Sequence, residues 1–213
     1  MNNKSVIFWN IDTQYDFVDP QGDLYVEGAE NLIDLWEEIL NYVRAHNIRL
    51  ISTKDHHFLD SSELSDNPDF IRTFPPHCIA FEKGERSVLS GIEEESLELD
   101  WDVMMTKDHL VGIYEKGSPI TVLKDKFDFY EGNPNSKHLL SILKEKHMYV
   151  MGVAENVCVS QAAIALAKNG FSVTVISDAV RGIPGLVTPY EMWRELNIEL
   201  KSWGEVKSEI SRV

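Results

Sequence analysis

The sequence predicts an α/β fold with three layers, in which a central, mostly parallel β-sheet carries helices on both faces. Two observations support this prediction. Apolar runs of strand length alternate along the chain with longer stretches of helical periodicity, and no repeat or linker interrupts them. Strands separated by helices pair in parallel through right-handed crossovers. With 213 residues, 43% of them hydrophobic, the chain can bury a full core, so we expect a single domain over residues 1–213.

The first predicted strand is the apolar run at residues 6–11. A helix is expected after Gly28, because apolar side chains recur there at the spacing that forms one stripe: Leu32, Leu35, Trp36, Ile39, Leu40 and Val43. This helix should end near residues 46–47, and the second strand should run over residues 48–53.

The same alternation resumes in the second half of the chain. The expected elements are a strand at residues 120–123, a helix at 136–145, a strand at 147–153, a helix that begins near 157 and a strand at 172–177. Alanines on the helix after residue 157 allow close approach to the sheet, and Gly170 stops that helix.

Residues 54–118 form a loop-rich insert between these two halves. A segment of this length is too long to be structureless in a compact domain, so we expect it to hold short helices and to cover the active site. It carries an acidic block at residues 93–102, for which the sequence indicates no role.

The composition excludes several classes of protein. A formal net charge of -15 argues against binding nucleic acid or anionic membranes through charge. Two cysteines provide no disulfide framework and fit a reducing compartment. No apolar run has the length of a signal-peptide core or of a membrane span of ~20 residues. We therefore expect a cytoplasmic protein.

Cys158 stands where the strand at residues 147–153 gives way to a helix rich in small residues. The unpaired backbone N–H groups of a helix's first turn favour a thiolate and can also hold an oxyanion. Most free cysteines, however, are small buried hydrophobes. This motif alone does not decide between a nucleophile and a core residue.

Two other strand ends carry charged side chains. Asp12 follows the first strand, and Lys124 follows the strand at residues 120–123. Parallel strands end at one edge of a sheet, where open α/β folds bind their ligands. Taken alone, Asp12 is equally consistent with a helix or loop cap, and a lysine such as Lys124 is more often a solvated strand end. Together with Cys158 they supply the base and the cation that a cysteine nucleophile needs, which predicts a catalytic triad.

Three motifs resemble those of the isochorismatase-like cysteine hydrolases, and most closely those of their nicotinamidase branch. Residues 11–17, Ile-Asp-Thr-Gln-Tyr-Asp-Phe, are similar to the family's opening Val-Asp-x-Gln-x-Asp-Phe. Residues 152–159, Gly-Val-Ala-Glu-Asn-Val-Cys-Val, are similar to the Gly-Val-Ala-Thr-x-x-Cys-Val run that carries the nucleophile. Lys124 precedes an aromatic cluster and Gly132, like the family's lysine. The resemblance covers nearly the whole chain and implies an isochorismatase-like fold.

The resemblance also implies an activity. Asp12 is expected to be the catalytic acid and base, and Cys158 the nucleophile that hydrolyses a small amide, nicotinamide in the first place, through a thioester. A cis peptide bond between Val153 and Ala154 is implied, which turns backbone amides toward the substrate oxygen. The implied partner is a small-molecule amide, and the family often assembles into homo-oligomers.

A metal site is predicted from two further motifs. Asp55 and His57 are two residues apart, so in an extended segment their side chains point the same way while His56 points away. His77 follows a stiff pair of prolines twenty residues later. Aspartate and histidine are suitable ligands for a divalent metal such as zinc. In nicotinamidases the matching residues bind a metal that orients the pyridine nitrogen, so the resemblance implies Asp55, His57 and His77 as ligands.

Phe17 and Phe74 are candidates to flank an aromatic substrate. Each is also a candidate core residue, and for Phe17 the core is slightly favoured. The chain departs from the nicotinamidases in both metal motifs, where His56 and Phe74 replace a tryptophan. Val157 stands where the family frequently has an aromatic residue. The catalytic chemistry is therefore better determined by the sequence than the substrate is.

Three other interpretations remain open. The first is another branch of the same family, which acts on a different small amide, a ureido compound or an enol ether. The second is a metal-dependent phosphoesterase of the DHH type, whose signature matches residues 55–57, although Asp12 and Asp16 are the only candidates for its further metal-binding aspartates. The third is a non-enzymatic α/β binding module, which leaves the triad unexplained.

Overall fold

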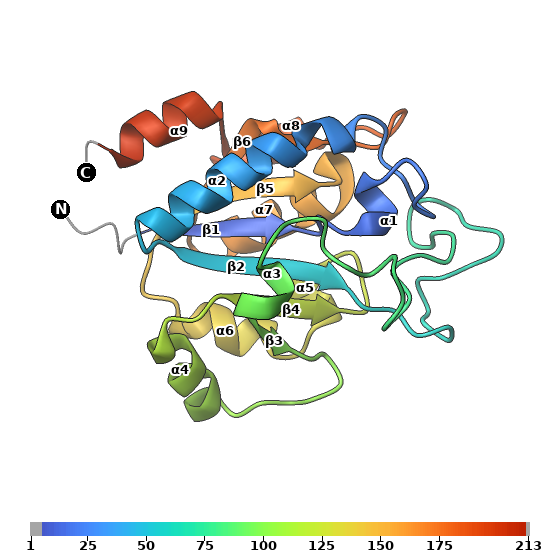
Figure 1. The fold of residues 1–213 in the computed structure, drawn as a ribbon, viewed down its shortest axis with the longest axis horizontal. Coiled ribbons are helices and arrows are strands. Elements are labelled where there is room, and N and C mark those ends of the chain that lie inside the picture. Colours follow the sequence, from blue (N-terminus) through green and yellow to red (C-terminus); the bar gives the residue numbers. More distant parts are fainter. Residues whose placement is uncertain (1–5, 212–213) are drawn as a thin grey trace.

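The computed structural model describes residues 6–211, which form one parallel sheet with surrounding helices (Figure 1). The sheet has the strand order β3-β4-β2-β1-β5-β6-β7, and each neighbouring pair is parallel. In chain order its strands are β1 (Val6–Ile11), β2 (Arg49–Asp55), β3 (Leu97–Leu99), β4 (Ile120–Lys124), β5 (His147–Val153), β6 (Ser172–Arg181) and β7 (Glu199–Lys201). The predicted parallel sheet is confirmed.

Helices cover both faces of the sheet, which confirms the prediction of three layers (Figure 1). One face carries α1 (Tyr15–Val18), the 3-10 helix η2 (Ala29–Leu32), α2 (Ile33–Ala45), α3 (Ile92–Glu95) and α9 (Trp203–Ile210). The other carries α4 (Lys107–Lys116), α5 (Phe129–Gly132), α6 (Ser136–Ile142), the π-helical turn η3 (Glu155–Val159), α7 (Ser160–Lys168) and α8 (Tyr190–Glu195).

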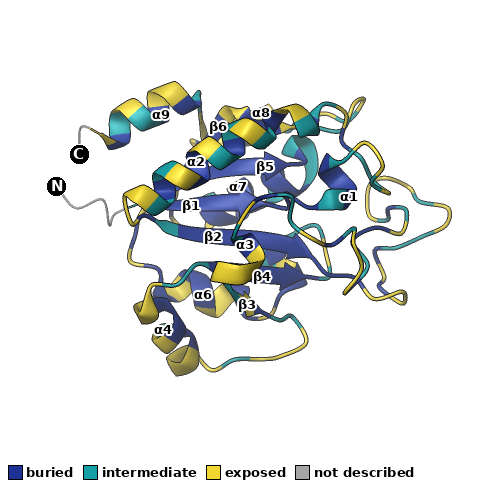
Figure 2. Cartoon of the chain, viewed as in Figure 1, coloured by how far each residue is buried: buried dark blue, intermediate teal, exposed yellow. Residues whose placement is uncertain are grey.

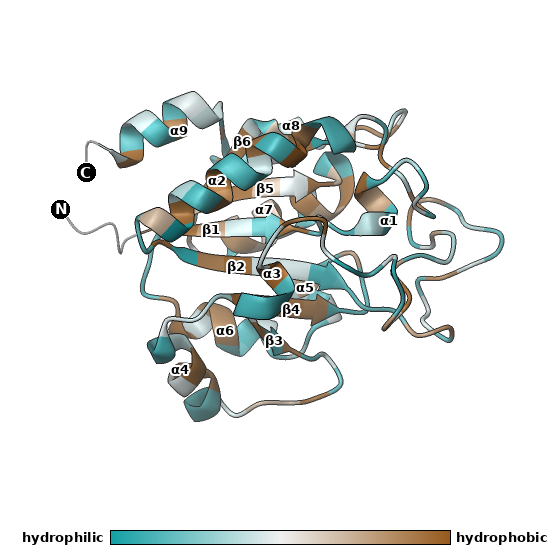
Figure 3. Cartoon of the chain, viewed as in Figure 1, coloured by the Kyte–Doolittle hydropathy of each residue, from teal (hydrophilic) through white to brown (hydrophobic). Residues whose placement is uncertain are grey.

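The core lies in two apolar layers, one on each side of the central strands, which are buried along most of their length (Figure 2). Helix α2 illustrates how the sequence pattern produces this packing. Its apolar and polar residues alternate around the helix (Figure 3), and the apolar stripe predicted from the sequence is the face that it buries. The buried residues of α2 are Trp36, Ile39, Leu40 and Val43.

Strand β6 is longer than predicted. Ser177 and Asp178 look like the end of the strand, but β6 continues to Arg181. The two polar side chains are exposed, and the residues after them, Ala179 and Val180, are buried again. An irregularity in the pairing of β5 with β6, between Val150 and Gly152, accompanies this extension.

Other elements differ because their sequences carry weak periodicity. Strand β3 lies within the acidic block at residues 93–102. The charged residues around its two leucines obscure the apolar pattern that would predict a strand there. Helix α6 ends at Ile142, three residues before the predicted end. The C-terminal elements α8, β7 and α9 were not predicted at all. Residues 56–91 contain no helix or strand, so the short helices expected in the insert lie in its second part, as α3 and α4.

The topology brings the predicted site residues to one edge of the sheet. Strands β4, β2, β1 and β5 are neighbours and, being parallel, end on the same side. Lys124 and Asp55 are the last residues of β4 and β2, Asp12 follows β1, and Cys158 lies in the turn after β5. Most of the segment 56–91 lies beyond this edge, past the arrowheads of the strands, and its last residues return over the face of the sheet to α3 (Figure 1). Among residues 6–211, no helix has both the length and the apolar character needed to cross a bilayer.

Candidate active site

Asp12 is fully buried directly after β1. Its φ of 47° lies in the left-handed region, which aspartate tolerates better than most residues do. Thr53 on the neighbouring strand β2 fixes this residue. Its hydroxyl donates to Oδ1 of Asp12 over 2.6 Å, and its carbonyl accepts from the Asp12 backbone N–H over 3.3 Å. The second carboxylate oxygen of Asp12 faces Lys124.

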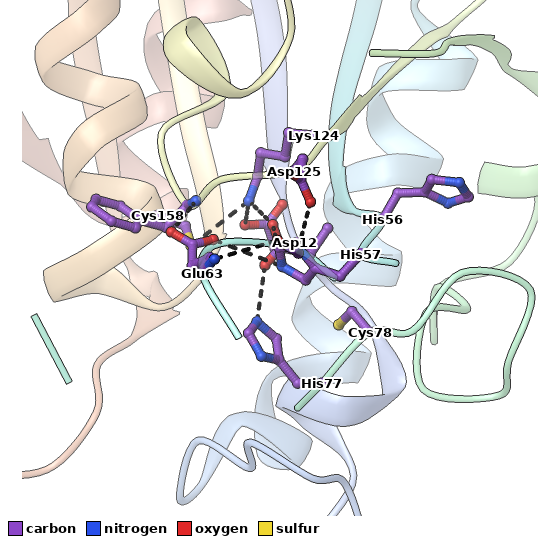
Figure 4. A network of polar contacts seen from close by, with 12 residues as sticks. Asp12, His56, His57, Glu63, His77, Cys78, Lys124, Asp125 and Cys158 are labelled. Carbon is purple, nitrogen blue, oxygen red and sulfur yellow. Dashed lines mark hydrogen bonds and ion pairs between the residues drawn. The ribbon is translucent and has the colours of Figure 1, made fainter. Parts of the chain in front are cut away.

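Lys124 links three residues of the site (Figure 4). Its buried Nζ lies 2.9 Å from Oδ2 of Asp12 and 3.9 Å from Sγ of Cys158, and it also donates a hydrogen bond to Oδ1 of Asp55. Burial opposes the positive charge, but the carboxylates of Asp12 and Asp55 outweigh burial and hold the pKa of Lys124 well above its usual range. The side chain is therefore a permanent cation.

Cys158 lies in η3, the π-helical turn that follows β5. The peptide bond between Val153 and Ala154, just before this turn, is cis, which is the geometry that the family resemblance implies. One carboxylate oxygen of Asp12 and one of Asp55 lie within 4.8 Å of the Cys158 sulfur. The predicted triad residues thus form one buried cluster with Asp55.

The protonation state of the Cys158 thiol is set by its burial and its charged neighbours. Burial raises the pKa of Cys158 well above its usual range, and the neighbouring carboxylates act in the same direction, while Lys124 opposes them. Burial also raises the pKa of Asp12, again against the effect of Lys124. In the resting site, burial and the neighbouring carboxylates thus favour the protonated thiol, as the mechanism expected from the sequence requires. A base must remove the proton before the sulfur can attack.

Asp55, His57 and His77 each bring one ligand atom within 4.8 Å of the others, as the sequence predicted. Figure 4 shows the rings of His57 and His77 within this cluster. Nε2 of His77 lies 3.5 Å from Oδ2 of Asp55, and Nε2 of His57 lies 3.8 Å from Oδ1. Nδ1 of His77 donates to the carbonyl of Pro75 over 2.7 Å, and Nδ1 of His57 lies 3.2 Å from the carboxylate of Asp125. These contacts orient both rings so that their Nε2 atoms face the cluster.

His56 points away from the cluster, as predicted (Figure 4). Its Nδ1 lies 3.0 Å from Oε1 of Glu85, and the same carboxylate oxygen lies 3.0 Å from Nζ of Lys54. These three buried side chains form a separate polar group on the other side of β2's end. His56 therefore helps to hold the insert in place through Glu85 and is not part of the metal cluster.

Glu63 is a residue of the site that the sequence did not reveal. It is buried in the irregular segment after β2, and its Oε2 lies 3.8 Å from Nε2 of His57. Its Oε1 accepts a hydrogen bond from the Phe127 backbone N–H over 3.0 Å. Burial, with a further effect from the charge of Asp55, raises the pKa of Glu63 to about 7. No spacing rule distinguishes this acid from its exposed neighbour Asp60.

The chemistry of this cluster fits a divalent metal ion. Nε2 of His57 and Oε2 of Glu63 are buried and have no hydrogen-bond partner among residues 6–211. Buried polar atoms are seldom left unpaired, and these two lie beside Asp55 and His77. Carboxylate oxygens and imidazole nitrogens are ordinary ligands of zinc. The residues present are therefore a suitable donor set for such an ion.

Two side chains of the opening motif hold this cluster in place. The Gln14 carboxamide accepts from the Asp55 backbone N–H over 2.7 Å and donates to the Asp55 carbonyl over 2.8 Å. Asp16 accepts from the backbone N–H of Cys78, the residue after His77, over 2.7 Å. The segment after β1 thus anchors the backbone at two of the three predicted ligands.

Cys158 and two of the predicted metal ligands, Asp55 and His77, line one cavity. Its walls are formed by Phe17, Leu24, Asp55, Glu63, Phe74, His77, Phe127, Ala154, Val157, Cys158 and Ile183. Phe17 and Phe74 both contact the ring of His77, with centroid distances of 5.3 and 6.2 Å. Both are also buried, so each is at once a core residue and a wall of the cavity.

Comparisons with known proteins give the following similarities. The domain model described as the isochorismatase domain matches residues 6–185. The chain is 26% identical to the nicotinamidase/pyrazinamidase of Mycobacterium tuberculosis over 200 residues, which cover 89% of this chain and 95% of that protein. It is 26% identical to the nicotinamidase of Saccharomyces cerevisiae over 196 residues, which cover 81% and 86% of the two chains. Among solved structures, the pyrazinamidase of Pyrococcus horikoshii in complex with zinc superposes with a TM-score of 0.68 at 20% identity, covering 93% of this chain and 99% of that one.

Proposed function

The chain belongs to the isochorismatase family, and from this premise we propose that it is a cysteine-dependent amidohydrolase whose substrate is nicotinamide. The observation that carries the proposal is the juxtaposition at one cavity of a thiol tied to Asp12 through Lys124 with the cluster around Asp55. The first group is suited to cleaving an amide, and the second to recognising a ring nitrogen. The nicotinamidases among the chain's relatives support this substrate.

In the first half of the reaction, Asp12 takes the proton of the Cys158 thiol and the sulfur attacks the carboxamide carbon. The backbone N–H groups of Ala154 and Cys158 stabilise the oxyanion of the tetrahedral intermediate. As the C–N bond breaks, Asp12 gives its proton to the leaving ammonia. The acyl group remains on Cys158 as a thioester.

In the second half, the ionised carboxylate of Asp12 takes a proton from a water molecule that attacks the thioester carbonyl. The C–S bond breaks, the acid leaves, and the sulfur recovers a proton from Asp12. Lys124 keeps its charge throughout, because its pKa is held well above its usual range. It orients Asp12 and stabilises the thiolate across the 3.9 Å that separates Nζ from Sγ.

Asp55, His57 and His77 would hold a divalent metal, for which zinc is the first candidate. Glu63 is close enough to His57 to be a further ligand. When bound, such an ion supplies a Lewis acid that accepts the lone pair of a pyridine nitrogen. Phe17 and Phe74, both buried against His77, would flank the substrate's ring and exclude water around it. The substrate's amide is thereby held within reach of the sulfur.

A second candidate substrate is a small carboxamide with an aliphatic acyl group. Leu24, Val157 and Ile183 make part of the cavity wall aliphatic, and Val157 stands where an aromatic residue is frequent in the family. These side chains would pack against a branched or linear chain as well as against a ring. Hydrolysis of such an amide requires the triad but does not require the metal cluster.

The test is ammonia release from a panel of small amides by the purified 213-residue chain, with and without added zinc. The panel holds nicotinamide, pyrazinamide and an aliphatic amide such as butyramide. We expect nicotinamide to have the highest kcat/KM and the metal to raise it. Faster release from butyramide would favour the second candidate. Release from none of the amides would overturn the proposed activity.

A further inference from the structure

The loop at residues 182–189, which follows β6, is hydrogen-bonded to η3, the turn that carries Cys158. Asn156 lies two residues before Cys158 in η3. Its Oδ1 accepts from the Ile183 backbone N–H over 3.0 Å, and its Nδ2 donates to the carbonyls of Ile183 and Leu186 over 2.9 and 3.1 Å. One carboxamide thus binds three backbone groups of this loop.

The local sequence is adapted to this contact. A Cβ atom at Gly182 would lie 3.0 Å from Nδ2 and 3.2 Å from Cγ of Asn156, so a glycine lets the loop approach this closely. The far end of the loop is tied to the same turn, because Glu155 accepts a hydrogen bond from the hydroxyl of Tyr190. Two consecutive residues of η3 therefore hold both ends of the loop.

The position of the loop matters because Ile183 is a wall of the cavity, beside Val157 and Leu24. The Cys158 side chain is only 6% exposed, so a substrate that reaches it must fit between such walls. Elsewhere the loop has little packing of its own, since Pro184, Gly185 and Val187 are exposed. Ile183 itself packs against the apolar core of one face, and the hydrogen bonds of Asn156 fix the backbone that carries it.

We propose that Asn156 is a positioning residue that sets the width of the cavity beside Cys158 by holding Ile183 in place. The inference rests on the proposed role of Cys158, but not on which amide is the substrate. With the three hydrogen bonds intact, the cavity accepts a small acyl group and excludes bulkier ones. Without them, the wall loosens, larger groups enter, and small substrates bind less well, while the reacting atoms stay where they are.

Two variants remove these hydrogen bonds in different ways. Asn156→Asp keeps the size of the side chain but points a carboxylate oxygen at the two carbonyls that Nδ2 now serves. Asn156→Ala removes the group. Val187→Ala is the matched control, because this side chain lies on the same loop and is 86% exposed. Ile183→Ala trims the wall directly and, in combination with Asn156→Ala, should add little, since both changes act on one wall.

The first measurement is the alkylation of Cys158 in a Cys78→Ala background, followed by intact mass. A small reagent, iodoacetamide, is compared with a bulky one, N-phenylmaleimide, at fixed pH. This readout needs no substrate, so it separates failure of the inference from failure of the proposed activity. We expect both Asn156 variants to raise the bulky-to-small rate ratio about tenfold, which is the scale of losing one or two net hydrogen bonds. Val187→Ala should leave the ratio unchanged.

The second measurement uses the amide that the panel identifies as the best substrate. In the Asn156 variants KM should rise about tenfold with kcat within about twofold, because binding is weakened and not the chemistry. Equal changes in the two alkylation rates, or a fall in kcat at unchanged KM, would overturn the inference and assign Asn156 to the thiol itself. If neither variant folds, Gly182→Ala tests the same contact, since its Cβ would lie 3.0 Å from Nδ2 of Asn156 and would push the carboxamide against its hydrogen-bond partners.

Discussion

Nζ of Lys124 and Oδ2 of Asp12 lie 2.9 Å apart in an ion pair whose side chains are almost completely buried. Removing two such charges from water is costly, and leaving one of them without its partner costs more. Lys124 also binds Asp55, so two carboxylates depend on a single ammonium group. The proposed triad and the proposed metal cluster are therefore one electrostatic unit.

Lys124→Met should destabilise the protein as well as inactivate it. It leaves two buried carboxylates without their cation, which should lower the free energy of unfolding by about 3–5 kcal/mol. Lys144→Met is the matched control, because Lys144 is 74% exposed and lies 3.9 Å from the exposed Glu115. Such a surface pair contributes ~0.2–1 kcal/mol at most. Urea unfolding measures the free energy of unfolding of both variants. A similar loss in the two would contradict the argument.

Cys158→Ala should abolish ammonia release and leave the fold intact, because it trims one small side chain. Cys78→Ala is the natural control. Cys78 is also buried, but its sulfur faces the Gly84 carbonyl at 3.8 Å and not Lys124. We expect this variant to keep most of the initial rate. An inactive Cys78 variant beside an active Cys158 variant would refute the assignment of the nucleophile.

The sequence was sufficient to predict that the three residues of the proposed triad lie together, because each stands at or shortly after the end of a strand of the central sheet. Parallel strands place their carboxyl ends side by side, so Asp12, Lys124 and Cys158 could be brought together without knowledge of any loop. The period of two along an extended chain likewise separated His56 from Asp55 and His57. These predictions used regular geometry, which local sequence patterns encode.

The remaining parts of the site depend on irregular backbone. Glu63 reaches the cluster through a segment without helix or strand, where long-range contacts such as the one to the Phe127 amide fix its position. Asn156 acquires its role only because the loop after β6 folds back onto η3. The raised pKa of Cys158 was also beyond the sequence, since the depth of burial that causes it is a property of the whole fold.

Asp12 should control the acid side of the pH profile. The proposed base must be ionised, and burial raises the pKa of Asp12 in spite of Lys124. As the pH falls through this raised pKa, the carboxylate takes up a proton and kcat/KM should drop. The midpoint should therefore lie above the usual range for aspartate, and Asp12→Asn, which cannot titrate, should be inactive at every pH. A profile of kcat/KM that stays flat into the ordinary aspartate range would speak against this role.

The histidines whose rings face Asp55 should be required for zinc binding, and a neighbouring histidine whose ring points away should not. After dialysis against a chelator and addition of zinc, mass spectrometry of the bound metal should find one ion per chain in the wild type. His57→Ala and His77→Ala should lose it, because each removes a nitrogen that faces Asp55. His56→Ala should retain it, since that ring contacts Glu85 on the far side of the strand end.

Glu63→Gln preserves the size of the side chain but removes a charge. The affinity for zinc should therefore fall at least tenfold, on the scale of ~10–100-fold seen when a metal site loses a supporting partner. Full zinc retention in both His57 and His77 variants, or its loss on changing His56, would show that the cluster is not a metal site, and the case for nicotinamide over an aliphatic amide would lose its main physical support.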